Sequence, residues 1–295
     1  MKITTLERVQ QTQFEILDEI ARICYANDIK FQLFAGSLLG AARHGNIIPW
    51  DDDIDIAMLR TDYIKFLKIA PQELSHKYFL QSAITDKHSA FSFAKVRKNN
   101  TIFIEKGTKT LDIHQGIFID IFPLDNINFD KHNKKIINKL KILIGINRRA
   151  NSTFVFNKKK LLLQPLKFIL RIFRLPTSYY QKKIDKLIIK LNNEESDFVN
   201  HLTNGITNNR FERFLMKKED ALNLIDVEFE GHKFPVTANY HEFLTRCYGD
   251  YMVLPPVDKQ QPHHGSLISI DGITIFDGFN DTEGKKIDES AFKIK

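Results

Sequence analysis

The sequence predicts an α+β fold in which helices flank a mixed β-sheet that carries a basic helical insertion. The first observation is an amphipathic run over residues 6–24, whose apolar residues recur every three or four positions with Gln13 as the polar interruption. The second is a series of short apolar or alternating runs, each typical of a strand. These runs are residues 31–35, 54–58, 78–81, 91–97, 101–105 and 116–122.

Further elements follow from the same patterns. Gly36 and Ser37 open a compact helical turn after the first strand, and residues 62–70 have helical periodicity. Residues 227–236 alternate around Glu230-Gly231, which predicts a β-hairpin, and residues 239–248 predict a helix that Gly249 ends. From Gly265 onward the periodicity is weak.

The composition is that of an ordinary globular protein. Of 295 residues, 43% are hydrophobic and 27% charged, which excludes a disordered chain or a disulfide-stapled miniprotein. Cys24 and Cys247 lie far apart and form no CxxC pair, so we expect a reducing compartment and no cysteine zinc site. No signal peptide is apparent, and the longest apolar run, residues 161–173, is broken by polar residues. The sequence therefore predicts a cytoplasmic protein, with peripheral attachment to the inner face of the cytoplasmic membrane as an option.

Charge is distributed very unevenly along the chain. The formal net charge is +7, but residues 131–190 hold 17 Lys and Arg and one acid, Asp185, and so carry +16. The other residues hold 26 Lys and Arg against 35 acids, a net −9. A block this basic is expected to meet an anionic partner such as lipid headgroups, nucleic acid or a phosphorylated glycan.

The basic block divides the chain into three predicted regions. Residues 1–130 form a core, residues 131–205 a helical insertion, and residues 206–295 complete the core. Within the block, the mixture of apolar and basic residues from 161 to 174 suits a helix on an anionic membrane surface. The alternative is a helical subdomain that packs its apolar side on the body and turns its basic side to water.

The acidic stretch over residues 51–55 carries the clearest chemical signal. Asp51, Asp53 and Asp55 are two residues apart, so on a strand their carboxylates project from one face and repel unless a cation joins them. Oxygen ligands suit Mg²⁺, which proteins usually hold with one or two carboxylates and substrate phosphates. Upstream, Gly36 and Ser37 would offer N–H groups and a hydroxyl to a phosphate. The alternative is a solvated turn before the strand.

A further carboxylate, Asp120, stands inside an otherwise apolar strand pattern, where an unpaired charge is costly. Ligation of the same metal ion is one explanation, and an ion pair with Arg97 is the other. Asp125, which follows Pro123, is predicted to be a cap or turn residue.

Several segments together resemble the LicD family of phosphotransferases, which is also similar to the catalytic domains of fukutin and fukutin-related protein. The segments are FAGSLLGAARHGNIIPWDDDIDIAM, FAKVRKNNTIFIE, GIFIDIFPLD and FPVTANYHEFLTRCYGDYMVLPP, followed by His263 and His264. They run in order and leave the basic insertion and the two ends unmatched. Thr237 stands where the family often has Pro, and zinc ligands of the fukutin type are not identifiable.

The resemblance implies a nucleotidyltransferase-like fold. It also implies transfer of phosphocholine from CDP-choline to a hydroxyl of a cell-surface glycan or lipooligosaccharide precursor, with release of CMP. The implied catalytic carboxylates are Asp53, Asp55 and Asp120, which with Asp51 would bind Mg²⁺ or, alternatively, Mn²⁺. The implied substrate-binding residues are Gly36, Ser37, Lys95, Arg97, His263 and His264. Arg43 joins them by its position between the Gly-Ser turn and the acidic strand, with support of that loop as its alternative.

Two other functions remain open. Transfer of ribitol or glycerol phosphate from its CDP donor would use the same site, whereas aromatic rings around the donor would favour choline, because a quaternary ammonium prefers an aromatic cage. A scaffold that binds membrane or nucleic acid without activity would explain the basic block but not the acidic strands. No specific nucleic acid is expected, because no reading motif is present.

Overall fold

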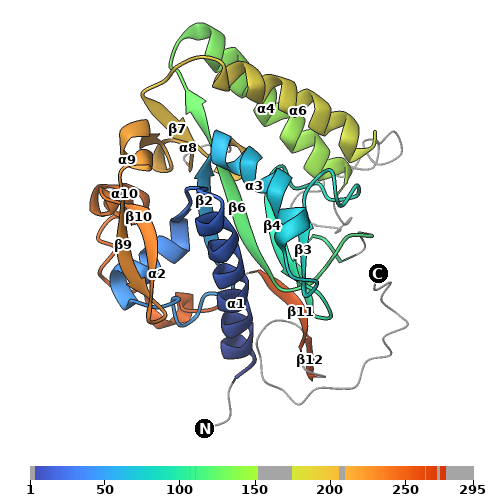
Figure 1. The fold of residues 1–295 in the computed structure, drawn as a ribbon, viewed down its shortest axis with the longest axis vertical. Helices are drawn as coiled ribbons and strands as arrows, with labels where there is room; N and C mark the ends of the chain where they lie inside the picture. Colours follow the sequence, from blue (N-terminus) through green and yellow to red (C-terminus); the bar gives the residue numbers. More distant parts are fainter. Residues whose placement is uncertain are drawn as a thin grey trace.

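The computed structural model describes residues 4–105, 107–109, 111–151, 175–205, 210–262, 264–270 and 273–276. Within these residues, helices flank a mixed sheet, which confirms the predicted α+β class (Figure 1). The main sheet contains β1 (Gln32–Leu33), β2 (Asp55–Leu59), β3 (Tyr78–Gln81), β4 (Ala94–Lys98), β6 (Phe118–Ile127), β7 (Phe198–Asn200) and β8 (Met216–Lys217). Its central order is β1-β2-β6-β4-β3, and β7 pairs with both β6 and β8. Among the described pairs, β2 and β6 run parallel and the others antiparallel.

Helix α1 (Thr5–Ala26) confirms the first predicted helix and packs on the sheet at β4 and β6. It begins with a capping box, in which the Thr4 hydroxyl accepts from the Glu7 N–H and the Glu7 carboxylate accepts from the Thr4 N–H. The polar interruption, Gln13, is fully buried and donates to the carbonyl of Asp52 at 2.8 Å. Helix α3 (Arg60–Glu73) contacts α1 and also packs on the sheet (Figure 1).

The connection from β1 into α2 (Ala35–His44) brings the start of a helix next to β2. Ala35 has φ +47°, a left-handed conformation that is strained for a residue with a Cβ. The Ser37 hydroxyl then accepts a hydrogen bond from the Asp55 N–H at 2.8 Å. The first turn of α2 is thereby fixed against the strand that carries Asp55.

The predicted hairpin is confirmed as β9 (Leu224–Phe229) and β10 (His232–Thr237). Its turn residues, Glu230 and Gly231, both have positive φ, as the tight turn of a twisted hairpin requires. Helix α10 (Tyr240–Tyr248) follows and ends at Gly249, as predicted.

The weakly periodic segment after Gly265 is nevertheless β-structure. Strands β11 (Gly265–Ile270) and β12 (Ile273–Phe276) pair with each other, and β11 pairs with β5 (Ile102–Glu105). The pairing of β11 with β5 joins distant parts of the chain, and local periodicity does not reveal such a contact.

In the described part of the basic block, two helices share a small core. Helices α4 (Lys131–Ala150) and α6 (Thr177–Asn192) pack against each other above the end of β6 (Figure 1). Their shared core includes Ile127 of β6, Leu140 of α4 and Ile184 of α6, all fully buried. The predicted membrane-facing stretch, residues 161–174, lies outside the described residues, and the three-region division stays a prediction.

The remaining described helices are short: α7 (Leu202–Gly205), α8 (Arg210–Arg213), α9 (Lys218–Leu222) and a 3₁₀ turn, Val257–Lys259. No helix in the described part of the chain is long and apolar enough to cross a bilayer.

The prediction of a cap or turn at Asp125 is wrong, because β6 continues through Pro123 to Ile127. Pro123 lies between the end of the β4 ladder and the start of the β7 ladder, where a residue without an N–H is tolerated. The Asp125 side chain is fully buried and accepts from Arg60 Nε and Nη2, both at 2.7 Å. It also accepts from Asn192 Nδ2 of α6 at 2.7 Å, and so joins the helical pair to the sheet.

We predict that Asp125→Ala lowers the free energy of unfolding by about 3–5 kcal/mol, because it leaves the Arg60 charge buried without its partner. Glu195→Ala is the matched control, because Glu195 is 98% exposed in its ion pair with Lys218, and we expect it to cost less than about 1 kcal/mol. Urea unfolding measures both, and equal losses in the two variants would contradict the assignment.

Candidate active site

The parallel pairing of β2 and β6 places Asp55 directly beside Asp120. On the other side of β6, the antiparallel ladder places Lys95 of β4 beside Asp120. Side chains at paired positions share one face of a sheet. Asp55, Asp120 and Lys95 therefore form a row across three strands.

Lys95 compensates part of the negative charge in this row. Its Nζ lies 2.6 Å from Asp120 Oδ1 and 3.1 Å from Glu105 Oε1, and the side chain is 1% exposed. Nζ also lies 3.5 Å from the centroid of the Phe118 ring. The ammonium group is thus enclosed by carboxylates and an aromatic face, which stabilise it away from water.

Asp51 and Asp53 lie on the loop that precedes β2, since the strand begins only at Asp55. Asp52, which the sequence analysis did not select, fastens this loop to the C-terminal part of the chain. Its buried carboxylate accepts from the N–H groups of His264 and Gly265 and from His264 Nδ1, each at 2.9 Å. The loop is therefore an anchored element rather than a solvated turn.

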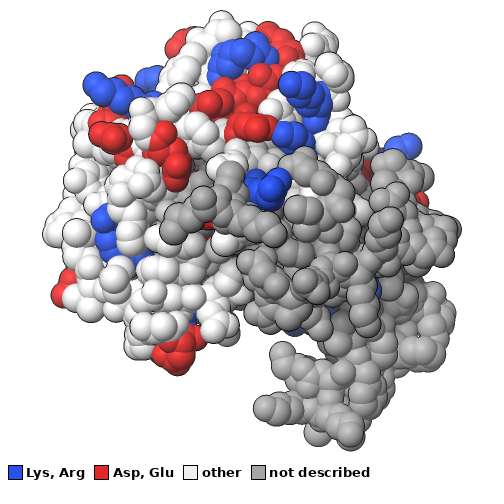
Figure 2. Space-filling view, turned by 90° about the horizontal axis from the view of Figure 1, so that it is seen from below, with Lys and Arg blue, Asp and Glu red and all other residues white. Residues whose placement is uncertain are grey.

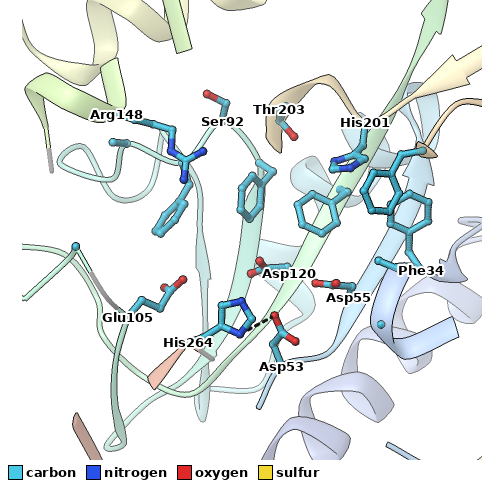
Figure 3. Close-up of a pocket in the computed structure, with 18 of the residues that line it drawn as sticks. Phe34, Asp53, Asp55, Ser92, Glu105, Asp120, Arg148, His201, Thr203 and His264 are labelled. Carbon is cyan, nitrogen blue, oxygen red and sulfur yellow. Dashed lines mark ion pairs between the residues drawn. The ribbon is translucent and has the colours of Figure 1, made fainter. Parts of the chain in front are cut away.

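His264 is held over the acidic loop by this anchor. Its Nδ1 lies 3.3 Å from Asp53 Oδ2 (Figure 3). One ligand atom from each of Asp51, Asp52, Asp53 and His264 lies within 4.8 Å of the others, a spacing at which these groups could hold a metal ion.

A cleft of about 590 Å³ opens over these side chains. Figure 3 shows Asp53, Asp55, Asp120 and His264 at one end and aromatic rings between them and the labelled Ser92 and Thr203. The aromatic lining consists of Phe34, Phe91, Phe93, Phe122, His201, Phe214 and Tyr248. The cleft thus combines an acidic end with an aromatic wall, and its lining comes from both halves of the sequence.

The carboxylates at the acidic end are poorly solvated and repel one another. Burial, followed by the charge of Asp51, raises the pKa of Asp53 to about 7. Burial raises the pKa of Asp120 to about 6, although Lys95 opposes the shift. Burial and the charges of Asp53 and Asp120 raise the pKa of Asp55 well above its ordinary value.

His264 and Asp52 show the opposite balance. Burial disfavours the imidazolium of His264, but the hydrogen bond to Asp52 and the charge of Asp53 outweigh it and raise the pKa of His264 to about 10. Burial would raise the pKa of Asp52, but the hydrogen bonds from His264 and Gly265 lower it overall. The anchor is therefore an ion pair at neutral pH.

The four carboxylates that line the acidic end of the cleft fit a hard divalent cation. Asp51, Asp53, Asp55 and Asp120 supply only oxygen atoms, which are the ligands that Mg²⁺ and Mn²⁺ prefer. Burial and then mutual repulsion raise their pKa values, and a bound cation would offset both effects. The single positive charge of Lys95 is not enough to neutralise these four carboxylates.

The structure brings some of the predicted substrate-binding residues to the cleft. Gly36 lines it, and a Cβ at this position would lie 3.0 Å from Asp51 Oδ2, so a larger residue would require that carboxylate to shift. Ser37 is not among the residues that line the cleft, and its hydroxyl accepts a hydrogen bond from the Asp55 N–H. His264 also lines the cleft, whereas His263 lies outside the described residues.

Arg43 and Arg97 are placed elsewhere. Arg43 donates to His44 Nε2 and to the Tyr251 carbonyl, the loop-supporting role that the sequence left as its alternative. Arg97 is fully buried and donates to Gln81, to the Gly116 carbonyl and to Glu105. Since the β4 register sets Arg97 opposite Phe118 and Lys95 opposite Asp120, the alternative Arg97–Asp120 ion pair is not formed.

Comparison with known proteins shows which family has this site. A family model described as LicD/FKTN/FKRP, nucleotidyltransferase domain, matches residues 28–176. The lipopolysaccharide cholinephosphotransferase LicD of Haemophilus influenzae is 32% identical over 272 residues, which cover 90% of this chain and 97% of that protein. The chain belongs to the LicD family.

A shorter match reaches a second branch related to LicD. Ribitol 5-phosphate transferase FKRP of Homo sapiens is 46% identical over 43 residues, which are 15% of this chain and 9% of that protein. Membership of the LicD family confirms the resemblance drawn from the sequence, and it makes the chain a phosphotransferase.

We predict that, without divalent cations, the free energy of unfolding falls as pH rises. Asp53 and Asp120 have folded pKa values of about 7 and about 6 against 3.8 when unfolded, so the unfolded state binds fewer protons between these values and stability is lost from about pH 4 to pH 7. The stabilising charge of His264 is fully present below its unfolded pKa of 6.5 and is lost as pH rises toward 10.

Urea unfolding in a chelating buffer over this pH range measures the effect. Asp55→Asn should reduce the loss of the free energy of unfolding between about pH 4 and pH 7. Saturating Mg²⁺ should stabilise the wild type more at neutral than at acidic pH. The exposed control Asp258→Asn should change neither. A wild type whose stability is independent of both pH and Mg²⁺ would contradict the charge balance described for this site.

Proposed function

We propose that the protein transfers phosphocholine from CDP-choline to a hydroxyl of a cell-surface glycan or lipopolysaccharide precursor and releases CMP. The observation that carries the proposal is the row of carboxylates facing an aromatic wall in one cleft. Similarity along nearly the whole chain to a lipopolysaccharide cholinephosphotransferase supports the same reaction.

In this proposal, Asp53, Asp55 and Asp120, with Asp51, hold Mg²⁺ or Mn²⁺. The cation supplies charge neutralisation for the donor diphosphate and for the departing CMP. Lys95 keeps the Asp120 carboxylate oriented toward the cleft through its 2.6 Å ion pair. The positively charged His264, fixed by Asp52, adds a compensating charge beside the donor phosphates.

The acceptor hydroxyl must lose a proton as it attacks the phosphorus. A carboxylate beside the cation would accept that proton, and Asp53 is one of those that line the cleft. Gly36, at the start of α2, leaves room beside Asp51 for a phosphoryl group.

The lining of the cleft favours choline over an alditol. Phe34, Phe214 and Tyr248 line the same cavity as the carboxylates, so a trimethylammonium group would meet both aromatic faces and negative charge. An alditol would instead need several hydrogen-bonding groups at this position. Ribitol phosphate transfer remains the second candidate because of the short match to FKRP.

A membrane surface is the proposed partner of the basic helices. Exposed lysines occur on both described helices of the block, among them Lys135 and Lys139 on α4 and Lys182, Lys183 and Lys186 on α6. The opposite end of the molecule differs, because Figure 2 shows groups of Asp and Glu beside Lys and Arg on its described surface. This polarity would orient the protein on anionic lipid at the inner face of the cytoplasmic membrane.

We predict that Asp53→Asn and Asp120→Asn lower CMP release by at least about 100-fold, because each removes charge that balances the reacting phosphates. The assay measures CMP from CDP-choline, CDP-ribitol and CDP-glycerol with Mg²⁺ and a glycolipid acceptor fraction. Asp258→Asn, an exposed acid outside the cleft, should keep full activity.

Release from CDP-choline alone is the expected result. CMP release only from CDP-ribitol or CDP-glycerol would show that the donor is an alditol compound and not CDP-choline. A folded Asp53→Asn protein with normal turnover would refute the role given to the carboxylates.

A further inference from the structure

Two hydroxyl groups in the cleft have no hydrogen-bond partner among the residues that the structure describes. Ser92 is 9% exposed and Thr203 is 2% exposed, and both line the cavity. Neither Ser92 Oγ nor Thr203 Oγ1 has a hydrogen-bond partner within the described part of the chain. Buried polar groups are almost always paired, so two unpaired hydroxyls in one cavity point to groups of a bound ligand.

Both hydroxyls lie at the end of the cleft away from the carboxylates, beyond the row of rings (Figure 3). Ser92 stands between Phe91 and Phe93, whose ring centroids are 5.4 Å apart, and the Phe93 ring is 4.7 Å from that of Phe122. Thr203 follows two residues after His201, whose ring is 4.9 Å from Phe122. The hydroxyls thus border one continuous aromatic surface.

The chemistry of this end selects the kind of ligand. A hydroxyl both donates and accepts, so it pairs with the edge of a heterocyclic base or with ribose hydroxyls. Aromatic faces favour a flat ring beside those groups. A trimethylammonium group has no hydrogen-bonding atoms and would leave both hydroxyls unpaired.

The burial of Ser92 and Thr203 indicates which of the two substrates, donor or acceptor, binds at this end of the cleft. A glycan acceptor is joined to a larger molecule and needs an open path, whereas the nucleoside is the free end of a small donor. Thr203 is almost completely enclosed. The site therefore suits the terminal group of the donor.

We propose that Ser92 and Thr203 bind the nucleoside part of the donor, with the rings of Phe91, Phe93 and Phe122 against its base. This inference rests on the proposed function, because it takes the donor to be a nucleoside diphosphate compound. The donor then spans the cleft, with its diphosphate at the acidic end and its nucleoside at the hydroxyl end.

Isothermal titration of the full chain with CMP in Mg²⁺ tests the proposal. Ser92→Ala and Thr203→Val should each raise the Kd for CMP by about fivefold to tenfold, the usual effect of one lost hydrogen bond. The Kd for phosphocholine, titrated in parallel, should not change. Since neither hydroxyl has a hydrogen-bond partner among the described residues, neither variant should lose stability.

Ser89→Ala is the matched control. Ser89 is 1% exposed and its Oγ is also unpaired within the described chain, but it is not among the residues that line the cleft. CMP affinity should therefore stay the same in this variant.

The outcomes separate this inference from the proposed function. CMP binding by the wild type that both cleft variants retain unchanged would overturn the nucleoside site alone. An equal loss of phosphocholine affinity, or an equal effect of Ser89→Ala, would also overturn it. A wild type that binds no CMP would overturn the cytidine donor and the nucleoside site together.

Discussion

Repulsion among carboxylates that the sheet itself gathers is the constraint on which the site depends. Parallel pairing of β2 with β6 sets Asp55 against Asp120, and the loop before β2 adds Asp51 and Asp53. Lys95 balances part of this charge from the next strand. The remaining repulsion destabilises the cation-free fold, and a divalent ion bound here would relieve it.

A second interaction makes the arrangement possible. Asp52 is not among the residues that line the cleft, and its carboxylate binds the backbone and ring of His264 and the backbone of Gly265. This contact joins the acidic loop to β11, which pairs with β5, the strand that carries Glu105. The acidic end of the cleft is thus closed by residues more than 200 positions apart in sequence.

The sequence predicted those helices, strands and turns whose formation depends on residues close together in the chain. The periodicity of α1, the alternation of β2 and the turn residues Glu230-Gly231 were sufficient, and the family resemblance selected Asp53, Asp55 and Asp120. Asp125 was mispredicted because its partner, Arg60, lies 65 residues away. Asp52, Ser92 and Thr203 could not be found, because burial and the presence or absence of a partner are properties of the folded chain.

The most direct test is isothermal titration of Mn²⁺ into the metal-free wild type, Asp55→Asn and Asp258→Asn. The account predicts saturable binding by the wild type and by Asp258→Asn, and an affinity lower by at least about tenfold in Asp55→Asn, because a carboxylate ligand is lost. Equal binding by all three proteins would show that the cation does not use this row of carboxylates, and would contradict the account.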